Sequence, residues 1–190
     1  MRAAITAVFF ANGLVFTSVY ARLPAIQAHL ELRPGALGLA LLGAPLGLLV
    51  AQPLVGAIIA ARGSRPVLAM APLLLLTAVL PALAMNVTSL LLAVLMVGAG
   101  NGALDIAMNA HGLAVEQAAG RRLFASLHAA FSFGALAGAT GAAGAAAAGL
   151  PVAAHLALAA AAGALVARAA MRHLPASPAR ATTPRFARPG

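Results

Sequence analysis

The chain has 190 residues, of which 63% are hydrophobic and only 8% are charged, and its net charge is +9. A soluble domain is about one-quarter charged, so this composition excludes a water-soluble globular protein. The charge comes entirely from arginines in short groups between apolar stretches, a pattern that argues against nucleic-acid binding. There is no cysteine, and we expect neither a metal site nor a cofactor.

Charge-free stretches of membrane length define the predicted architecture. A helix needs about 20 mostly apolar residues to cross a bilayer, and no Asp, Glu, Lys or Arg occurs within residues 34–61, 66–104 or 123–167. We therefore predict an all-α membrane protein in which residues 1–172 form six transmembrane helices. The predicted spans are 4–23, 38–60, 66–85, 89–114, 124–148 and 152–171. Residues 173–190 are predicted to be a basic, Pro-rich, disordered cytoplasmic tail.

The first span resembles a secretory signal peptide, but it leads directly into further membrane segments, so we expect it to be retained. Prolines in the second and third spans predict kinks, which neighbouring helices can accommodate in a membrane. In the fourth and fifth spans, Gly98/Gly102 and Gly134/Gly138 have the small-xxx-small spacing that allows close helix packing.

The distribution of arginine predicts the orientation. Short links make neighbouring spans antiparallel. With the N-terminus in the cytoplasm, ten arginines face inward and only Arg22 and Arg33 face outward. The positive-inside rule therefore predicts a multi-pass protein of the inner (plasma) membrane with both termini in the cytoplasm.

The fourth span carries the strongest candidate site. Asp105 is the only acid within a predicted span, and an ionised Asp at the bilayer centre costs about 3 kcal/mol. Asn101 and Asn109 lie one helical turn before and after it, so the three side chains form one polar stripe. A low dielectric disfavours the carboxylate, and we expect Asp105 to take up a proton near neutral pH. The alternative is a purely structural Asp that is hydrogen-bonded between helices.

Two further membrane residues are candidates for binding a polar ligand, Asn12 in the first span and His128 in the fifth. His128 can donate or accept a hydrogen bond or relay a proton. For both residues, a hydrogen bond to a neighbouring helix is the structural alternative. The chain has no nucleophile elbow, metal-binding histidine pair, phosphate loop or pair of membrane aspartates, so we do not expect an enzyme.

The link after the second span resembles the loop 2–3 signature of the major facilitator superfamily. The signature is Gly, three residues, Asp, a basic residue, any residue, Gly and two basic residues. Gly56, Gly63 and Arg65 match it, and Arg62 adds a positive charge at the unconstrained position. Ala60, Ala61 and Ser64 depart from it, so the acid that helps to latch the two halves of family members together is absent.

A narrower resemblance is to sugar:proton symporters of the fucose-permease type, whose fourth span carries an acid followed four residues later by Asn. Asp105 and Asn109 match this pattern, as does His128 ahead of the Ser-Phe-Gly of residues 132–134. The resemblance implies that Asp105 is the proton-coupling site and that Asn109 and His128 contact the solute. Residues 11–13, which include Asn12, also resemble this group.

Superfamily members have twelve spans in two halves, each built from two inverted three-span repeats. The resemblance therefore implies that this chain is the N-terminal half of a secondary transporter. It would move a small polar solute, such as a sugar, by proton symport, with a bilayer and a second six-helix half as partners. Two alternatives are a truncated or structural membrane subunit and half of a drug efflux pump. An arginine early in span four and a Gly-Pro pair in span five, typical of drug antiporters, are both missing.

Overall fold

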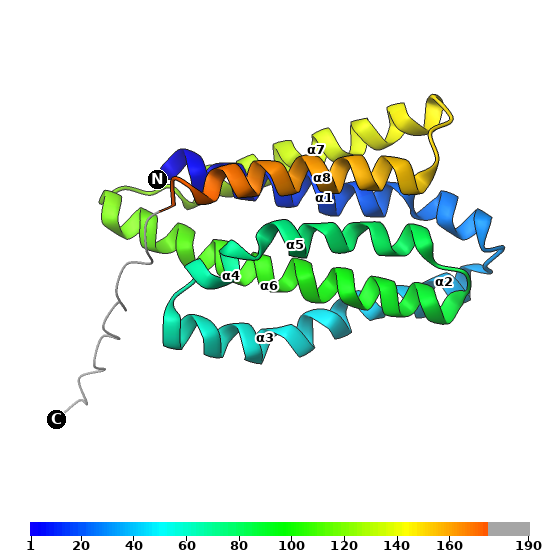
Figure 1. The fold of residues 1–190 in the computed structure, drawn as a ribbon, viewed down its shortest axis with the longest axis horizontal. Helices are drawn as coiled ribbons and strands as arrows, with labels where there is room; N and C mark the ends of the chain where they lie inside the picture. Colours follow the sequence, from blue (N-terminus) through cyan, green and yellow to red (C-terminus); the bar gives the residue numbers. More distant parts are fainter. Residues whose placement is uncertain (175–190) are drawn as a thin grey trace.

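A computed structural model describes residues 1–174, so most of the predicted tail, 173–190, lies outside the described residues. The described part is helical throughout, apart from short links (Figure 1). Its elements are α1 (Arg2–His29), α2 (Pro34–Leu41), α3 (Gly43–Arg62), α4 (Arg65–Ala69), α5 (Ala71–Leu76), the 3-10 helix η1 (Thr77–Leu83), α6 (Val87–Ala119), α7 (Phe124–Ala147) and α8 (Val152–Met171). The prediction of an all-helical bundle is confirmed.

Five segments of the described chain are long and apolar enough to cross a membrane: α1, the pair α2–α3, α6, α7 and α8. They overlap the predicted spans 4–23, 38–60, 89–114, 124–148 and 152–171. The helices α1 and α6 extend beyond the predicted spans, and local capping signals set the ends of α6. Asn86 and Ser89 form a capping box at the start of α6, and Gly120 ends it with a φ of +62°.

The structure differs from the prediction at the third span, 66–85, which is divided into α4, α5 and η1. Proline lacks an amide hydrogen and clashes with the preceding turn, so it is favoured only at a helix start. Pro66 and Pro72 occupy the first turns of α4 and α5, and Pro81 lies within η1. The broken segment still runs alongside α6 and α8 (Figure 1).

The closest helix pairs are α1 with α7 and α3 with α6. In both pairs glycine allows backbone-to-backbone contact. A Cβ at Gly134 would overlap the carbonyl oxygen of Phe10, and a Cβ at Gly98 would overlap that of Ala44. The predicted role of the small-xxx-small glycines is therefore confirmed, and Gly13 in α1 makes the same kind of contact with the carbonyl of Phe131.

The packing pattern has an internal symmetry. The first three spans are α1, α2–α3 and α4–η1, and the last three are α6, α7 and α8. When each span is matched with its counterpart, the pairing of α1 with α7 corresponds to the pairing of α6 with α3. In the same way, the contacts of α1 with α8 map onto those of α6 with α5 and η1. This arrangement is consistent with two three-span repeats, as expected for half of a major-facilitator-type fold.

The helices differ greatly in how much of their surface the chain covers. In the most apolar 18-residue stretch of α1 and of α6, 56% of the residues are buried, compared with 11% for α2–α3 and 22% for α7. The centres of the bundle are thus α1 and α6. Large apolar side chains on α3 and α7 stay exposed, among them Leu49, Leu54, Phe133 and Leu136.

Candidate functional site

The acid of the fourth predicted span forms a local pair within α6. The Nδ2 of Asn109 donates to the Oδ1 of Asp105 at 3.0 Å and to its backbone oxygen at 2.8 Å. Both residues are only partly buried. The Oδ1 of Asn109 is buried and has no hydrogen-bond partner among the described residues. The pair therefore keeps a buried acceptor without a partner beside a carboxyl group.

His128 of α7 is the next candidate residue, and its side chain has aromatic neighbours. Its ring packs between two phenylalanines, with centroids 5.5 Å from Phe9 of α1 and 4.8 Å from Phe124 of α7. Its Nδ1 is 3.3 Å from the carbonyl oxygen of Phe124, and the residue is exposed. The structure thus joins the acid and the amide within α6 and packs the imidazole of His128 where α7 meets α1.

The other two candidate residues lie in a different place. Asn12 is 1% exposed, and its Nδ2 is 3.8 Å from the sulfur of Met108. With Asn101 it lines a cavity between α1, α5, η1 and α6 that has about 10 Å³ of room, the size of one water molecule. The Oδ1 of Asn101 is buried without a partner among the described residues. Asn101 therefore lines this small cavity together with Asn12, whereas Asp105 and Asn109 are not among its lining residues.

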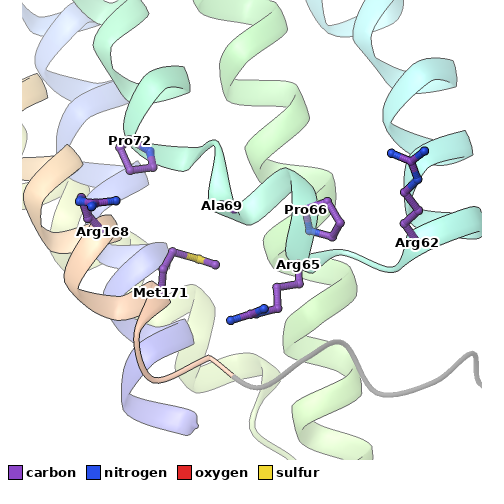
Figure 2. A pocket seen from close by; sticks show the side chains of 7 residues that line it. All are labelled: Arg62, Arg65, Pro66, Ala69, Pro72, Arg168 and Met171. Atoms are coloured by element: carbon purple, nitrogen blue, oxygen red, sulfur yellow. The ribbon is translucent and has the colours of Figure 1, made fainter.

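The residues of the loop 2–3 signature end α3 and begin α4. Gly63 adopts a φ of +76°, which L-residues with a side chain rarely adopt, and this explains the glycine. Gly56 has open space where a side chain would be. Arg62 and Arg65 line a hollow at this end of the bundle, together with Arg168 of α8 (Figure 2).

Three polar contacts were not predicted from the sequence. Ser64 Oγ lies 3.0 Å from the Nδ1 of the fully buried His111, which ties the loop to α6. Glu116 accepts the backbone N–H groups of Leu123 and Phe124, at 2.5 and 2.6 Å, and so caps the start of α7. For both His111 and Glu116, the only feature of the sequence that could have indicated these contacts is their position as polar residues near the end of a predicted span.

The third contact is made by Arg22, which is 5% exposed. Its guanidinium donates to the carbonyl oxygens of Leu150, at 2.7 Å, and Ala142, at 3.4 Å. Arg22 therefore ties α1 to the end of α7 and to the link before α8. The only feature of the sequence that could have indicated this contact is an arginine within a helix that extends past its apolar stretch.

The chain is similar in sequence to known membrane proteins. The chain is 34% identical over 134 residues to an uncharacterized MFS-type transporter of Yersinia pestis, which covers 70% of this chain and 35% of that protein. It is 32% identical over 139 residues to an uncharacterized transporter of Sinorhizobium fredii, covering 72% and 37% respectively. The membrane protein MosC of Rhizobium meliloti is 36% identical over 138 residues, covering 70% and 34%. No family model matches the chain.

The chain is a relative of membrane transporters. Together with five candidate membrane spans, these similarities identify a multi-pass membrane protein. The relatives carry transporter names, which describe a role that is not enzymatic. The chain spans about a third of the length of the relatives it matches.

Proposed function

We propose that this chain forms the first half of a secondary transporter of the major facilitator type, which moves a small polar solute by alternating access. The observation that carries the proposal is the hydrogen-bonded pair of Asp105 and Asn109 on the central helix α6. An ionisable residue within a membrane span is costly and normally serves an ion or solute pathway.

Proton coupling at Asp105 is part of the proposal. Asn109 holds the carboxyl group through one hydrogen bond. Protonation of Asp105 would remove the negative charge of this pair, and release of the proton would restore it. A proton symporter needs such a group whose charge changes as the transporter cycles.

A sugar is the solute class that we propose. The imidazole of the exposed His128 can bond to hydroxyl groups, and the exposed Phe133 offers an apolar surface on the same helix. Asn12 and Asn101 would act indirectly, by bonding across the interface of α1 and α6.

A second six-helix half is the proposed partner. The exposed apolar faces of α3 and α7 need a cover other than this chain, and the relatives are about three times as long as the matched region. The proposed location is the inner membrane with both ends of the bundle's chain in the cytoplasm. The start of α1 and the ends of α3, α6 and α8 lie at one end of the bundle, where most arginines gather (Figure 1).

Uptake driven by a proton gradient tests this function. The chain would be reconstituted in proteoliposomes with its second half, and a panel of labelled sugars would be offered with and without an inward proton gradient. We expect Asp105→Asn to abolish the acceleration by the gradient while exchange at equilibrium persists, because a neutral side chain cannot release a proton.

Glu31→Gln is the matched control, since it removes the exposed acid after α1 and should leave gradient-driven uptake unchanged. Unaltered proton-driven uptake in Asp105→Asn would overturn the coupling assignment. A protein that binds no second half in membrane crosslinking and transports nothing would instead be a structural subunit. Efflux of drugs in place of sugar uptake would favour the pump alternative.

A further inference from the structure

We propose that the small cavity between α1, α5, η1 and α6 is the binding site of one buried water molecule, which bridges the two three-span repeats. The cavity has a volume of about 10 Å³, which is the room that a single water requires. Its polar lining residues are Asn12 of α1, Thr77 of η1 and Asn101 of α6. Such a site requires neither a transported solute nor a second half, so it stands apart from the proposed transport function.

The two asparagines make fewer hydrogen bonds than their side chains allow. A side-chain amide carries two N–H donors and a carbonyl oxygen with two lone pairs. The Oδ1 of Asn101 is buried and has no partner among the described residues. Asn12 is 1% exposed, and its Nδ2 contacts the sulfur of Met108, a weak acceptor, at 3.8 Å. Buried polar groups without good partners cost free energy, which favours a ligand that can both donate and accept.

The third polar group comes from the span that prolines interrupt. Thr77 begins η1, and its Oγ1 donates to the carbonyl oxygen of Leu74 at 2.7 Å, so the lone pairs of the hydroxyl remain to accept. Gly100 allows this hydroxyl to approach α6, because a Cβ at Gly100 would lie only 3.0 Å from the Oγ1 of Thr77. A water in the cavity would therefore have polar groups on three segments around it, and two to four partners are typical of buried waters.

The rest of the lining favours a water over a metal cation. Most of it is apolar: Val15, Phe16, Leu75, Val97 and Leu104. Among the described residues that line the cavity, none is an acid, so a cation would bring an uncompensated charge into this interior. A water brings no charge, and it can donate to the Oδ1 of Asn101 while it accepts from an amide N–H of Asn12. It would thus join α6 to α1, the central helices of the two repeats.

An experimental structure of the full chain, at a resolution that reveals ordered waters, is the first test. We expect one peak of density in the cavity, within hydrogen-bonding distance of the Oδ1 of Asn101 and of the side-chain amide of Asn12. A cavity without such a peak would overturn the proposal. This test uses the unaltered chain, so it does not depend on the folding of any variant.

A double-mutant cycle tests the bridge. Asn12→Leu and Asn101→Leu should each lower the melting temperature by about 5 °C, because each leaves the other asparagine and the water short of a partner. The double variant should also lose about 5 °C rather than about 10 °C, since a cavity without either amide is apolar and has no polar group left to satisfy. Additive losses would overturn the bridge.

Asn12→Leu combined with Thr140→Val is the matched control, because Thr140 is exposed on α7 and bonds back to the carbonyl oxygen of Leu136. These two changes should be additive. A coupling as large as that between Asn12→Leu and Asn101→Leu would show that the coupling is not specific to the cavity and would also overturn the bridge.

Sodium distinguishes a water from a cation. The melting temperature of the unaltered chain should be the same in sodium chloride and in choline chloride at equal ionic strength, because a water site takes up neither cation. A higher melting temperature in sodium chloride that Asn101→Leu removes would overturn the assignment to water and indicate a cation site.

Discussion

The two three-span repeats share their packing but not their chemistry. The pair α1–α7 and the pair α3–α6 are both held together by glycines set against backbone carbonyls. Their central helices differ, however, because α6 carries an acid between two asparagines, whereas the polar side chains within the corresponding part of α1 are limited to Asn12 and small hydroxyl residues. The comparison indicates that close packing is a property of both repeats and that the ionisable site belongs to one of them.

The third spans differ in a second way. In the first repeat this span is interrupted by prolines and divided into α4, α5 and η1, whereas α8 is a continuous helix whose proline, Pro151, precedes it. In both repeats, nevertheless, the loop between the second and third spans contacts the central helix of the other repeat. Ser64 contacts His111 of α6, and the carbonyl of Leu150 accepts from Arg22 of α1.

The largest loss of stability is expected when the α1–α7 or the α3–α6 interface is disrupted. Gly134→Ala and Gly98→Ala should each destabilise the bundle by about 3 kcal/mol or more, because the added methyl group overlaps a backbone carbonyl that cannot rotate away. Reversible unfolding in mixed detergent, followed by circular dichroism, measures the change.

Gly141→Ala in the same helix α7 is the matched control, since its new methyl group would meet nothing within 4 Å. It should leave stability unchanged or slightly raise it. If one interface variant behaved like this control while the other unfolded, the two repeats would not be equivalent in packing.

A smaller loss of stability is expected when the contact between the loop of the first repeat and α6 is removed. Ser64→Ala should cost about 2 kcal/mol, because it removes the hydrogen-bond partner of a fully buried histidine. The same unfolding measurement applies, with Ser132→Ala as the control, whose hydroxyl is exposed and bonds back to the turn before it. Equal stability of the two variants would show that this contact does not support the loop.

The smallest effect concerns the junction at which α6 passes to α7. Glu116→Gln should destabilise the protein slightly, because a neutral amide oxygen accepts the two N–H groups at the start of α7 more weakly than a carboxylate does. Local hydrogen exchange at Leu123 and Phe124 should rise. The exposed Glu31→Gln should leave both readouts unchanged, and faster exchange there as well would contradict a local cap.

Much of the candidate site could be predicted because it is local. Asp105 and Asn109 are one turn apart, so helical periodicity alone places them together, and their hydrogen bond follows. The separation of Asn101 from this pair could not be predicted, since it depends on which neighbour covers each edge of α6. In the same way, the burial of Arg22 depends on the position of the link before α8, which no pattern in α1 encodes.

The amino-acid sequence alone determined that this is a helical membrane protein with arginine gathered at one end. The reason is that the insertion of a segment into a bilayer depends on the summed hydropathy and charge of neighbouring residues. Only the tertiary structure decided that His128 packs against Phe9, that Asn12 and Asn101 line one cavity, and that Ser64 meets His111. These contacts join residues that are distant in the chain, and they depend on the rotation and close approach of whole helices.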